Sequence, residues 1–200
     1  MLKESFQFFA DELNKYLILK QVVSSDLPRV VLGNVARAYD TETLQNADSV
    51  INRAVLSLVN IEEDRAAKKQ ENYIKTDINV KYKNPPLFLN LYMLVSVNRN
   101  NYAQSLTWLA HILQFFQFQN VFTPITHPSL DSRILKLIVE LYSLNFEQVN
   151  HLWSTLGGKY LPSVMYKIRQ VTIDEDLVTG ESGFIKEIDI EGKVKQPVTA

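Results

Sequence analysis

Hydrophobic residues recur at three- and four-residue steps in two long stretches of the chain, which is the spacing of one face of an α-helix. The first stretch starts at Leu2 and predicts a helix that ends near Gln21. The second follows Asn100 and Asn101, either of which suits the N-cap position, and it ends around Phe118. The chain is therefore expected to carry two long amphipathic helices.

Alternation of residue character predicts two long strands. LFLNLYMLVSVNR, from Leu87 to Arg99, is the longest strand candidate and has an aliphatic residue or Met at every odd-numbered position up to Val97. Its even-numbered positions mix apolar and polar residues, so we expect a second layer or a partner on that face, rather than bulk water. SVINRAVLSLVNIEED, residues 49–64, is apolar on both faces and is expected in the middle of a sheet.

Shorter strands are predicted at three further places. RVVLGNV contains Gly33, which favours a bulge or a close backbone approach, and INVKYK follows later in the chain. RILKLIVELYSL alternates in the manner of a strand with one buried side. The residues expected to face inward there are Leu135, Leu137, Val139 and Leu141.

The stretch HLWSTLGGKYLPSVMYKIRQVTI joins a short helix to a strand. The helix is expected to begin after Asn145 and to end at Gly157-Gly158, because glycine tolerates the left-handed turn that ends many helices. Pro162 prevents further helix, and VMYKIRQVTI then alternates as a strand. A hairpin over residues 174–194 is predicted to follow, with LVTGESG as its flexible tip and GFIKEIDIEGKV as its second arm.

Two polar segments are expected to be loops. Residues 37–49 have no clear period. Residues 62–77 mix both signs of charge with few apolar side chains, which is typical of a solvated loop that can carry contacts.

Composition bounds the fold and the function. With 200 residues, 46% of them hydrophobic, the chain can bury the core of a single α+β domain, for which we expect a mixed β-sheet with about three helices packed on it. Lys and Arg (21) nearly balance Asp and Glu (22), so no net field favours nucleic acid or a membrane surface, and neither is expected as a partner. The sequence has no cysteine, no signal-peptide pattern and no apolar run of the roughly 20 residues that span a membrane, so we expect synthesis and folding in the cytoplasm.

Residues that could carry chemistry are few. His111, His127 and His151 lie in none of the spacings that place two imidazoles on one helical face. Glu62-Glu63-Asp64 could bind a hard cation, but the basic residues beside them favour a self-compensating surface. Glycine-rich phosphate loops and the GxSxG elbow are also absent from the sequence. We therefore predict no catalytic, cofactor or metal site; a hydrolase that uses Glu62, Asp64 and His127 is the enzymatic alternative.

Two groups of aromatic residues are candidate interface anchors. Phe115, Phe116 and Phe118 lie within one helical turn and cannot all face the same core, so at least one of them is expected to be exposed or covered by another chain. The alternative is that it packs under a neighbouring loop of the same domain. The alternatives for the second group are anchors at an interface and ordinary core residues. Its members are Trp153, Tyr160 and Tyr166.

The order of six segments resembles a family of small proteins encoded beside contractile injection systems, which are related to phage tails. The resemblance covers residues 1–176. The segments are LGNV, LSLVNIEEDRAAKKQ, NPPLFLNLYMLVSVNRNNYAQSL, ILQFFQ, HPSL and LYSLNFEQVNHLWSTLGGKYLPSVMYKIR.

This resemblance implies a structural tail-terminator or cap protein with a phage tail-terminator-like fold, and no enzyme. Such a protein is expected to form a ring of six copies on the distal end of the tube and sheath, with itself, the sheath protein and the inner-tube protein as partners. Residues 1–176 would form the terminator-like domain, and residues 177–200 a hairpin or extension. The loop 62–77, with Glu62, Glu63 and Asp64, and the hairpin are candidates for gripping sheath or tube. An assembly adaptor or chaperone for the same particle is the alternative.

Overall fold

The computed structural model describes residues 1–22, 29–37, 51–65, 73–75, 79–157, 159–173 and 178–183. The chain divides into two compact units, one of residues 1–68 and 87–173 and the other of residues 69–86 and 174–200. The proposed division into residues 1–176 and 177–200 stays a prediction.

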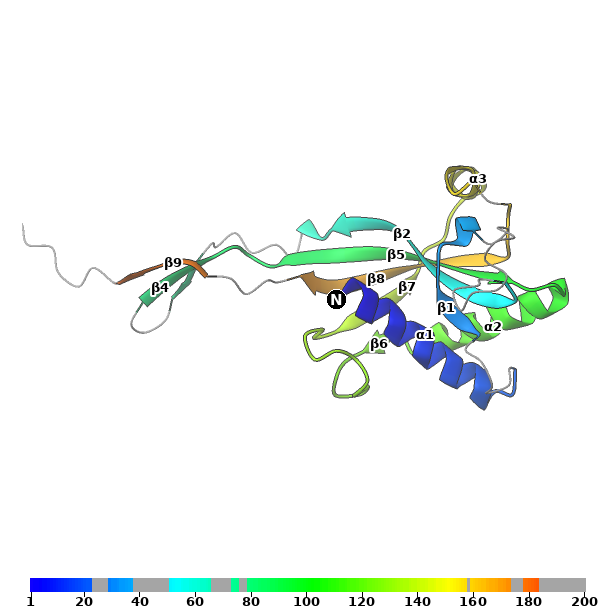
Figure 1. Cartoon of the computed structure of the whole chain (residues 1–200), viewed down its shortest axis with the longest axis horizontal. Helices are drawn as coiled ribbons and strands as arrows, with labels where there is room; N and C mark the ends of the chain where they lie inside the picture. The colour runs from blue at the N-terminus through cyan, green and yellow to red at the C-terminus, as the bar shows by residue number, and fades with distance from the viewer. Residues whose placement is uncertain are drawn as a thin grey trace, which may run out of the picture. The chain divides into compact units, whose positions relative to one another are not determined.

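A six-stranded mixed sheet is the centre of the first unit, in the order β1-β2-β5-β8-β7-β6 (Figure 1). β1 runs parallel to β2, and the other neighbours are antiparallel. With its three helices the unit is a single α+β domain, so the predicted fold class is confirmed. Its elements are α1 (Leu2–Leu19), β1 (Val30–Leu32), the 3₁₀ turn η1 (Val35–Arg37), β2 (Arg53–Glu63), β5 (Leu87–Asn98), α2 (Tyr102–Phe118), β6 (Val121–Phe122), β7 (Leu137–Leu141), α3 (Phe146–Thr155) and β8 (Ser163–Ile173).

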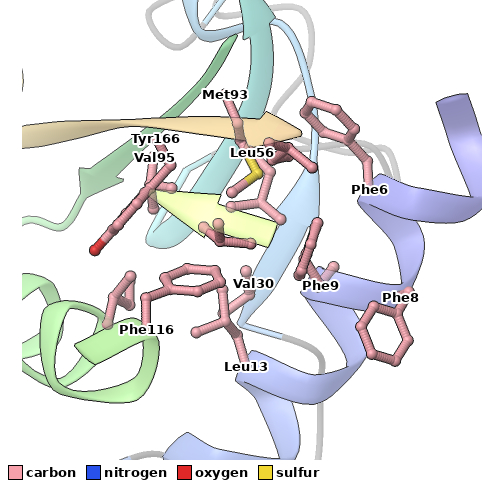
Figure 2. Packing of buried hydrophobic residues seen from close by; sticks show 14 of the residues in the cluster. Phe6, Phe8, Phe9, Leu13, Val30, Leu56, Met93, Val95, Phe116 and Tyr166 are labelled. Atoms are coloured by element: carbon pink, nitrogen blue, oxygen red, sulfur yellow. The ribbon is translucent and has the colours of Figure 1, made fainter. Parts of the chain in front are cut away.

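The main core lies between the sheet and the helices α1 and α2, which cover the same face (Figure 1). The odd-numbered side chains of β5, such as Met93 and Val95, point into it, as their alternation predicts. Phe9 from α1 and Phe116 from α2 meet there with ring centroids 5.8 Å apart (Figure 2). Each such buried side chain contributes about 1.5–3 kcal/mol of transfer free energy.

A second, smaller core lies on the opposite face of the sheet, beneath α3 (Figure 1). Leu94 of β5 packs there with Trp153 of α3 and Met165 of β8. The second layer that was predicted from the even-numbered positions of β5 is therefore present. Trp153 is the only buried residue within α3, so this short helix rests on a single large anchor.

Side-chain caps fix the helix ends at the predicted places. The Asn101 side chain accepts hydrogen bonds from the backbone N–H groups of Ala103 and Gln104. Asn145 and Gln148 form a reciprocal capping box at the start of α3. Gly157 follows α3 with φ of +63°, the left-handed conformation expected of it.

Polar side chains hold the short edge strand β1 in place. The Asn14 amide of α1 donates to the Val30 carbonyl at 2.8 Å and accepts from the Val30 and Arg29 N–H groups at 2.9 and 2.8 Å. Just after β1, the Gly33 carbonyl accepts a hydrogen bond from the buried Ser57 hydroxyl of β2 at 2.6 Å. The same hydroxyl accepts from the Val35 N–H at 3.2 Å. Gly33 therefore makes the predicted close approach, to β2.

Two details of the predicted strands are wrong. β2 is buried on both faces only in its first half, because β1 has three residues and pairs only with 54–56, which leaves Leu58 and Ile61 exposed. Leu135 and Leu141 are exposed as well: Leu135 precedes the regular part of β7, which begins at Leu137, and Leu141 is the last residue of that strand. Of the predicted loop at residues 37–49, only Arg37 is described, and it closes η1.

The second unit contains a three-stranded antiparallel sheet in the order β3-β4-β9, from β3 (Tyr73–Lys75), β4 (Asn79–Lys83) and β9 (Val178–Gly183). β4 is the predicted INVKYK strand. β9 corrects the prediction of a flexible tip, because VTGESG pairs with β4. The predicted loop 62–77 is also too long, since Glu62 and Glu63 belong to β2 and Tyr73–Lys75 form β3. The second hairpin arm lies outside the described residues, apart from Gly183.

Candidate protein-binding groove

A groove of about 600 Å³ lies between α3 and the outer part of the sheet. Its walls come from the exposed half of β2, from the loop after β7 and from one side of α3. We call it the α3 groove. Its lining residues are Val59, Asn60, Ile61, Glu62, Tyr92, Tyr142, Leu144, Gln148, His151, Leu152, Thr155 and Met165.

The groove exists because α3 is shorter than the strands beneath it. β7 ends where the Tyr142 N–H donates to the Met165 carbonyl at 2.8 Å, and the chain then leaves the sheet to start α3 at Asn145. The ten residues of α3 cover Leu94, but Tyr92 stays only half-buried. A smaller pocket of about 290 Å³ adjoins the groove and shares Tyr142, Leu144, Leu152 and Met165 with it.

Polar contacts at one end of the groove connect three strands. The Tyr92 hydroxyl of β5 donates to Glu62 Oε2 of β2 at 2.6 Å, and Lys167 Nζ of β8 lies 3.5 Å from the same oxygen. Lys167 Nζ also lies 5.4 Å from the centroid of the Tyr92 ring, over its face. The ring of Tyr142 meets Tyr92 edge-on, with centroids 5.1 Å apart. Tyr92 and Tyr142 therefore form an aromatic wall at this end of the groove, beside the Glu62 carboxylate.

Hydrogen bonding shifts the pKa values at this end in opposite directions. The hydrogen bond from Tyr92, helped by the positive charge of Lys167, lowers the pKa of Glu62. The same bond to Glu62 raises the pKa of Tyr92, and burial adds to that rise. At neutral pH, Glu62 is therefore an anion and Tyr92 a neutral donor. An apolar groove that ends in a carboxylate suits an apolar side chain next to a cation.

Of the predicted acidic cluster, only Glu62 lines the groove. Glu63 is the last residue of β2 and Asp64 follows it, with the Asp64 N–H donating to the Phe88 carbonyl at 2.8 Å. Both have further partners in the chain.

The three predicted phenylalanines of α2 separate into core and surface. Phe115 and Phe116 are buried, and their rings lie tilted against those of Tyr16 and Tyr166 respectively. Phe118, the last residue of α2, is 82% exposed. Of the three, Phe118 is therefore the one whose side chain another molecule can reach.

The second aromatic group divides in the same way. Trp153 is buried beneath α3, and Tyr160 packs edge-on against it at 5.7 Å but remains 62% exposed. Tyr166 is buried against Phe116, and burial raises the pKa of its hydroxyl. For all nine predicted residues, a role at an interface stays a prediction.

The histidines lie in different surroundings. His127 packs against Phe8 and Phe122 on the α1 side of the sheet, with its Nδ1 2.9 Å from the Thr126 hydroxyl. Glu62 bonds to Tyr92 on the opposite face, so the structure does not bring together the residues of the hydrolase alternative. His151 lines the α3 groove, and His111 lies in α2. Within the described ranges, three or more His, Asp or Glu side chains nowhere gather in a way that could hold a metal ion.

Tyr92, Tyr142, Leu144 and Leu152 are groove residues that sequence reasoning did not select. The available signal was the mixed face of the 87–99 strand, which predicted a covering layer but not that this layer would stop short of Tyr92.

The model of one protein family, described as the Pvc16 N-terminal domain, matches residues 9–187. Among the described residues, no helix is both long and apolar enough to cross a bilayer. A comparison with curated proteins gave no match.

Two solved structures share the fold. One is the PVC sheath/tube terminator of an extracellular contractile injection system in its extended state, with a TM-score of 0.54 and 12% identity over 96% of this chain and 65% of that one. The other is the anti-feeding prophage cap, the AFP tube terminating cap, with a TM-score of 0.53 and 12% identity over 90% of this chain and 60% of that one. This chain thus spans less than two thirds of the length of either.

Proposed function

The chain belongs to the Pvc16 N-terminal domain family, and on this premise we propose that it is a structural terminator of a contractile injection system. In this role, copies of the chain form a ring, most simply of six, that closes the distal end of the tube and sheath. The protein is made and assembled in the cytoplasm and leaves the cell only as part of a particle.

The observation that carries the proposal is the shared fold. The match to the sheath/tube terminator extends over 96% of this chain, so it includes the sheet and the helices that surround the α3 groove. Within the described part, the residues of the hydrolase alternative lie on opposite faces of the sheet, and the groove has the character of a protein-binding surface.

A closed ring needs a head-to-tail interface, in which one patch on a subunit meets a different patch on the next. Of the nine predicted interface residues, Phe118, Tyr160 and Glu62 expose most of their side chains and are the ones that touch a neighbour directly. The buried ones act indirectly, since they hold α2, α3 and β8 in position.

The β3-β4-β9 sheet is the proposed grip on the sheath or tube. Within the described residues, β3 and β9 each pair on one side only, with β4. An unpaired strand edge can accept a strand from another protein. Deleting residues 177–200, which removes β9, should therefore impair attachment; unchanged rings and unchanged particle length in the deletion strain would contradict this part.

The main test is to delete the gene in a strain that makes the particles and to image the particles that remain. We expect tubes and sheaths of uneven length with open distal ends, and normal length when the chain is restored. Peptides of this chain in purified intact particles, with label at the distal end only, distinguish a terminator from an adaptor that leaves after assembly. Particles of normal length in its absence would contradict the proposal.

A further inference from the structure

Two of the most exposed apolar residues lie at one end of the β6–β7 pair. Val121 pairs with Ile138 and Phe122 with Leu137, so the segments 123–126 and 133–136 leave the same end of this antiparallel pair. The first segment carries Ile125, which is 92% exposed, and the second carries Leu135, which is 78% exposed. We call Ile125 and Leu135 the apolar knob.

Positive charge flanks the knob. Arg133 and Lys136 lie on either side of Leu135 in the sequence. Arg133 is already paired with Asp131 at 2.6 Å, whereas Lys136 makes no ion pair with any residue that the structure describes. Leu135 is thus an exposed aliphatic side chain beside a cation that has no ionic partner within the described ranges.

The α3 groove has the complementary character. Val59, Leu144 and Leu152 give it apolar walls, and Glu62 at its end is ionised and 52% exposed. Only Oε2 of this carboxylate bonds to Tyr92 and Lys167; among the described residues, Oε1 has no partner.

We propose that the knob of one copy of this chain occupies the α3 groove of the next copy, with Leu135 between the apolar walls and Lys136 beside Glu62. The proposal rests on the proposed ring, and it names the two surfaces that form it. The knob precedes β7 and the groove follows it, so a five-residue strand, about 17 Å long, separates them in one subunit. Two different patches at opposite ends of a strand give the head-to-tail contact that a ring requires.

Cysteine cross-linking tests the contact directly, because the natural chain has no cysteine. Tagged full-length Leu135→Cys is mixed with untagged Val59→Cys, on the apolar wall of the groove, and oxidised; a disulfide forms only where the two Cα atoms come within about 7 Å. We expect a tagged–untagged dimer. Leu106→Cys, on an exposed position of α2, replaces Leu135→Cys in the control and should give none. Absence of the dimer, or an equal yield in the control, overturns the proposal.

Substitutions give an independent readout. Leu135→Ser should weaken self-association by about tenfold to a hundredfold, the effect of losing one buried aliphatic side chain, whereas Leu106→Ser should leave it unchanged. Lys136→Glu and Glu62→Lys should each weaken association up to about fivefold, and mixing the two variants should restore it.

Failure of the proposed contact and failure of the proposed terminator function would give different results. If Leu135→Ser chains still form rings and cap particles, this contact is wrong and the terminator function stands. If natural chains are absent from particle ends, the function is wrong whatever the cross-links show.

Discussion

Tyr92 of β5 and Glu62 of β2 are joined by a 2.6 Å hydrogen bond at the mouth of the α3 groove. The bond crosses two strands diagonally, since Tyr92 lies opposite Asn60 and Glu62 opposite Asn90 in the register. The bond holds the Glu62 carboxylate and the Tyr92 ring in position, so its removal should change the pKa of Glu62 without changing the fold.

Replacing Tyr92 by Phe should raise the pKa of Glu62 toward its ordinary value. A carboxylate with a lowered pKa in the folded state contributes stability above its unfolded pKa, and this stability is lost as the pH falls through the folded value. The difference in unfolding free energy between the natural chain and Tyr92→Phe should therefore be largest at neutral pH and should vanish in acid. NMR titration of the Glu62 carboxyl measures the shift directly.

Tyr142→Phe is the matched control, because Tyr142 contacts the same ring but is not hydrogen-bonded to Glu62. An unchanged pKa of Glu62 in Tyr92→Phe, or an equal change in Tyr142→Phe, would contradict the assignment.

Asn14→Ala should destabilise the protein by about 1–3 kcal/mol, because it leaves partly buried backbone groups of Arg29 and Val30 without partners. Urea unfolding gives the value. Gln7→Ala removes an exposed hydrogen bond on the same helix and should cost much less. Similar losses in the two variants would mean that Asn14 does not hold β1.

Phe116→Ala and Phe118→Ala should have very different effects on the free energy of unfolding, although the residues are only two positions apart. Phe116 is buried among Phe9, Phe115 and Tyr166, and its truncation should cost about 3–5 kcal/mol of unfolding free energy. Phe118 is exposed, and its truncation should change stability by less than about 0.5 kcal/mol. Thermal or urea unfolding of both variants tests the contrast.

Association measurements on Phe118→Ala then test its predicted place at an interface. Weaker self-association or weaker tube binding at unchanged stability is the expected result. Natural behaviour in both assays would remove Phe118 from the candidate interface.

Asn145→Ala should loosen α3 without unfolding the sheet. Loss of a capping side chain costs about 0.5–2 kcal/mol, and α3 has only Trp153 as a buried anchor. Hydrogen exchange should accelerate at the amides of α3 and remain slow in β5. Asn150→Ala, in the middle of the same helix, has no capping role and should not accelerate exchange; equal protection in both variants would contradict this expectation.

Sequence reasoning succeeded where the signal was local. Asn100 or Asn101 was predicted as the cap of α2, Asn145 as the cap of α3 and Gly157-Gly158 as a helix stop. These signals are readable in the sequence because each acts on backbone groups within a few residues. The alternation of the 87–99 strand predicted a core on one face and a second layer or a partner on the other. The family resemblance is confirmed by the match over residues 9–187 and by the two solved terminators.

Sequence reasoning failed where the structure depends on pairing between strands that are distant in the sequence. Leu135 was assigned to the core from its alternation with Leu137, but the start of β7 depends on the two residues of β6 that pair with it. VTGESG looked like a tip because its composition favours turns, whereas its partner β4 lies about a hundred residues earlier. Glu62 was selected for its charge; Tyr92 and Tyr142 join it only because α3 ends before covering them.

Asn14 has one more effect beyond stability. By bonding both main-chain groups of Val30, the Asn14 side chain occupies the backbone positions at which a strand from another molecule would otherwise pair with β1. Edge-to-edge aggregation through this residue of β1 is thereby disfavoured, so copies of the chain that lie close together are less able to join their sheets at this edge.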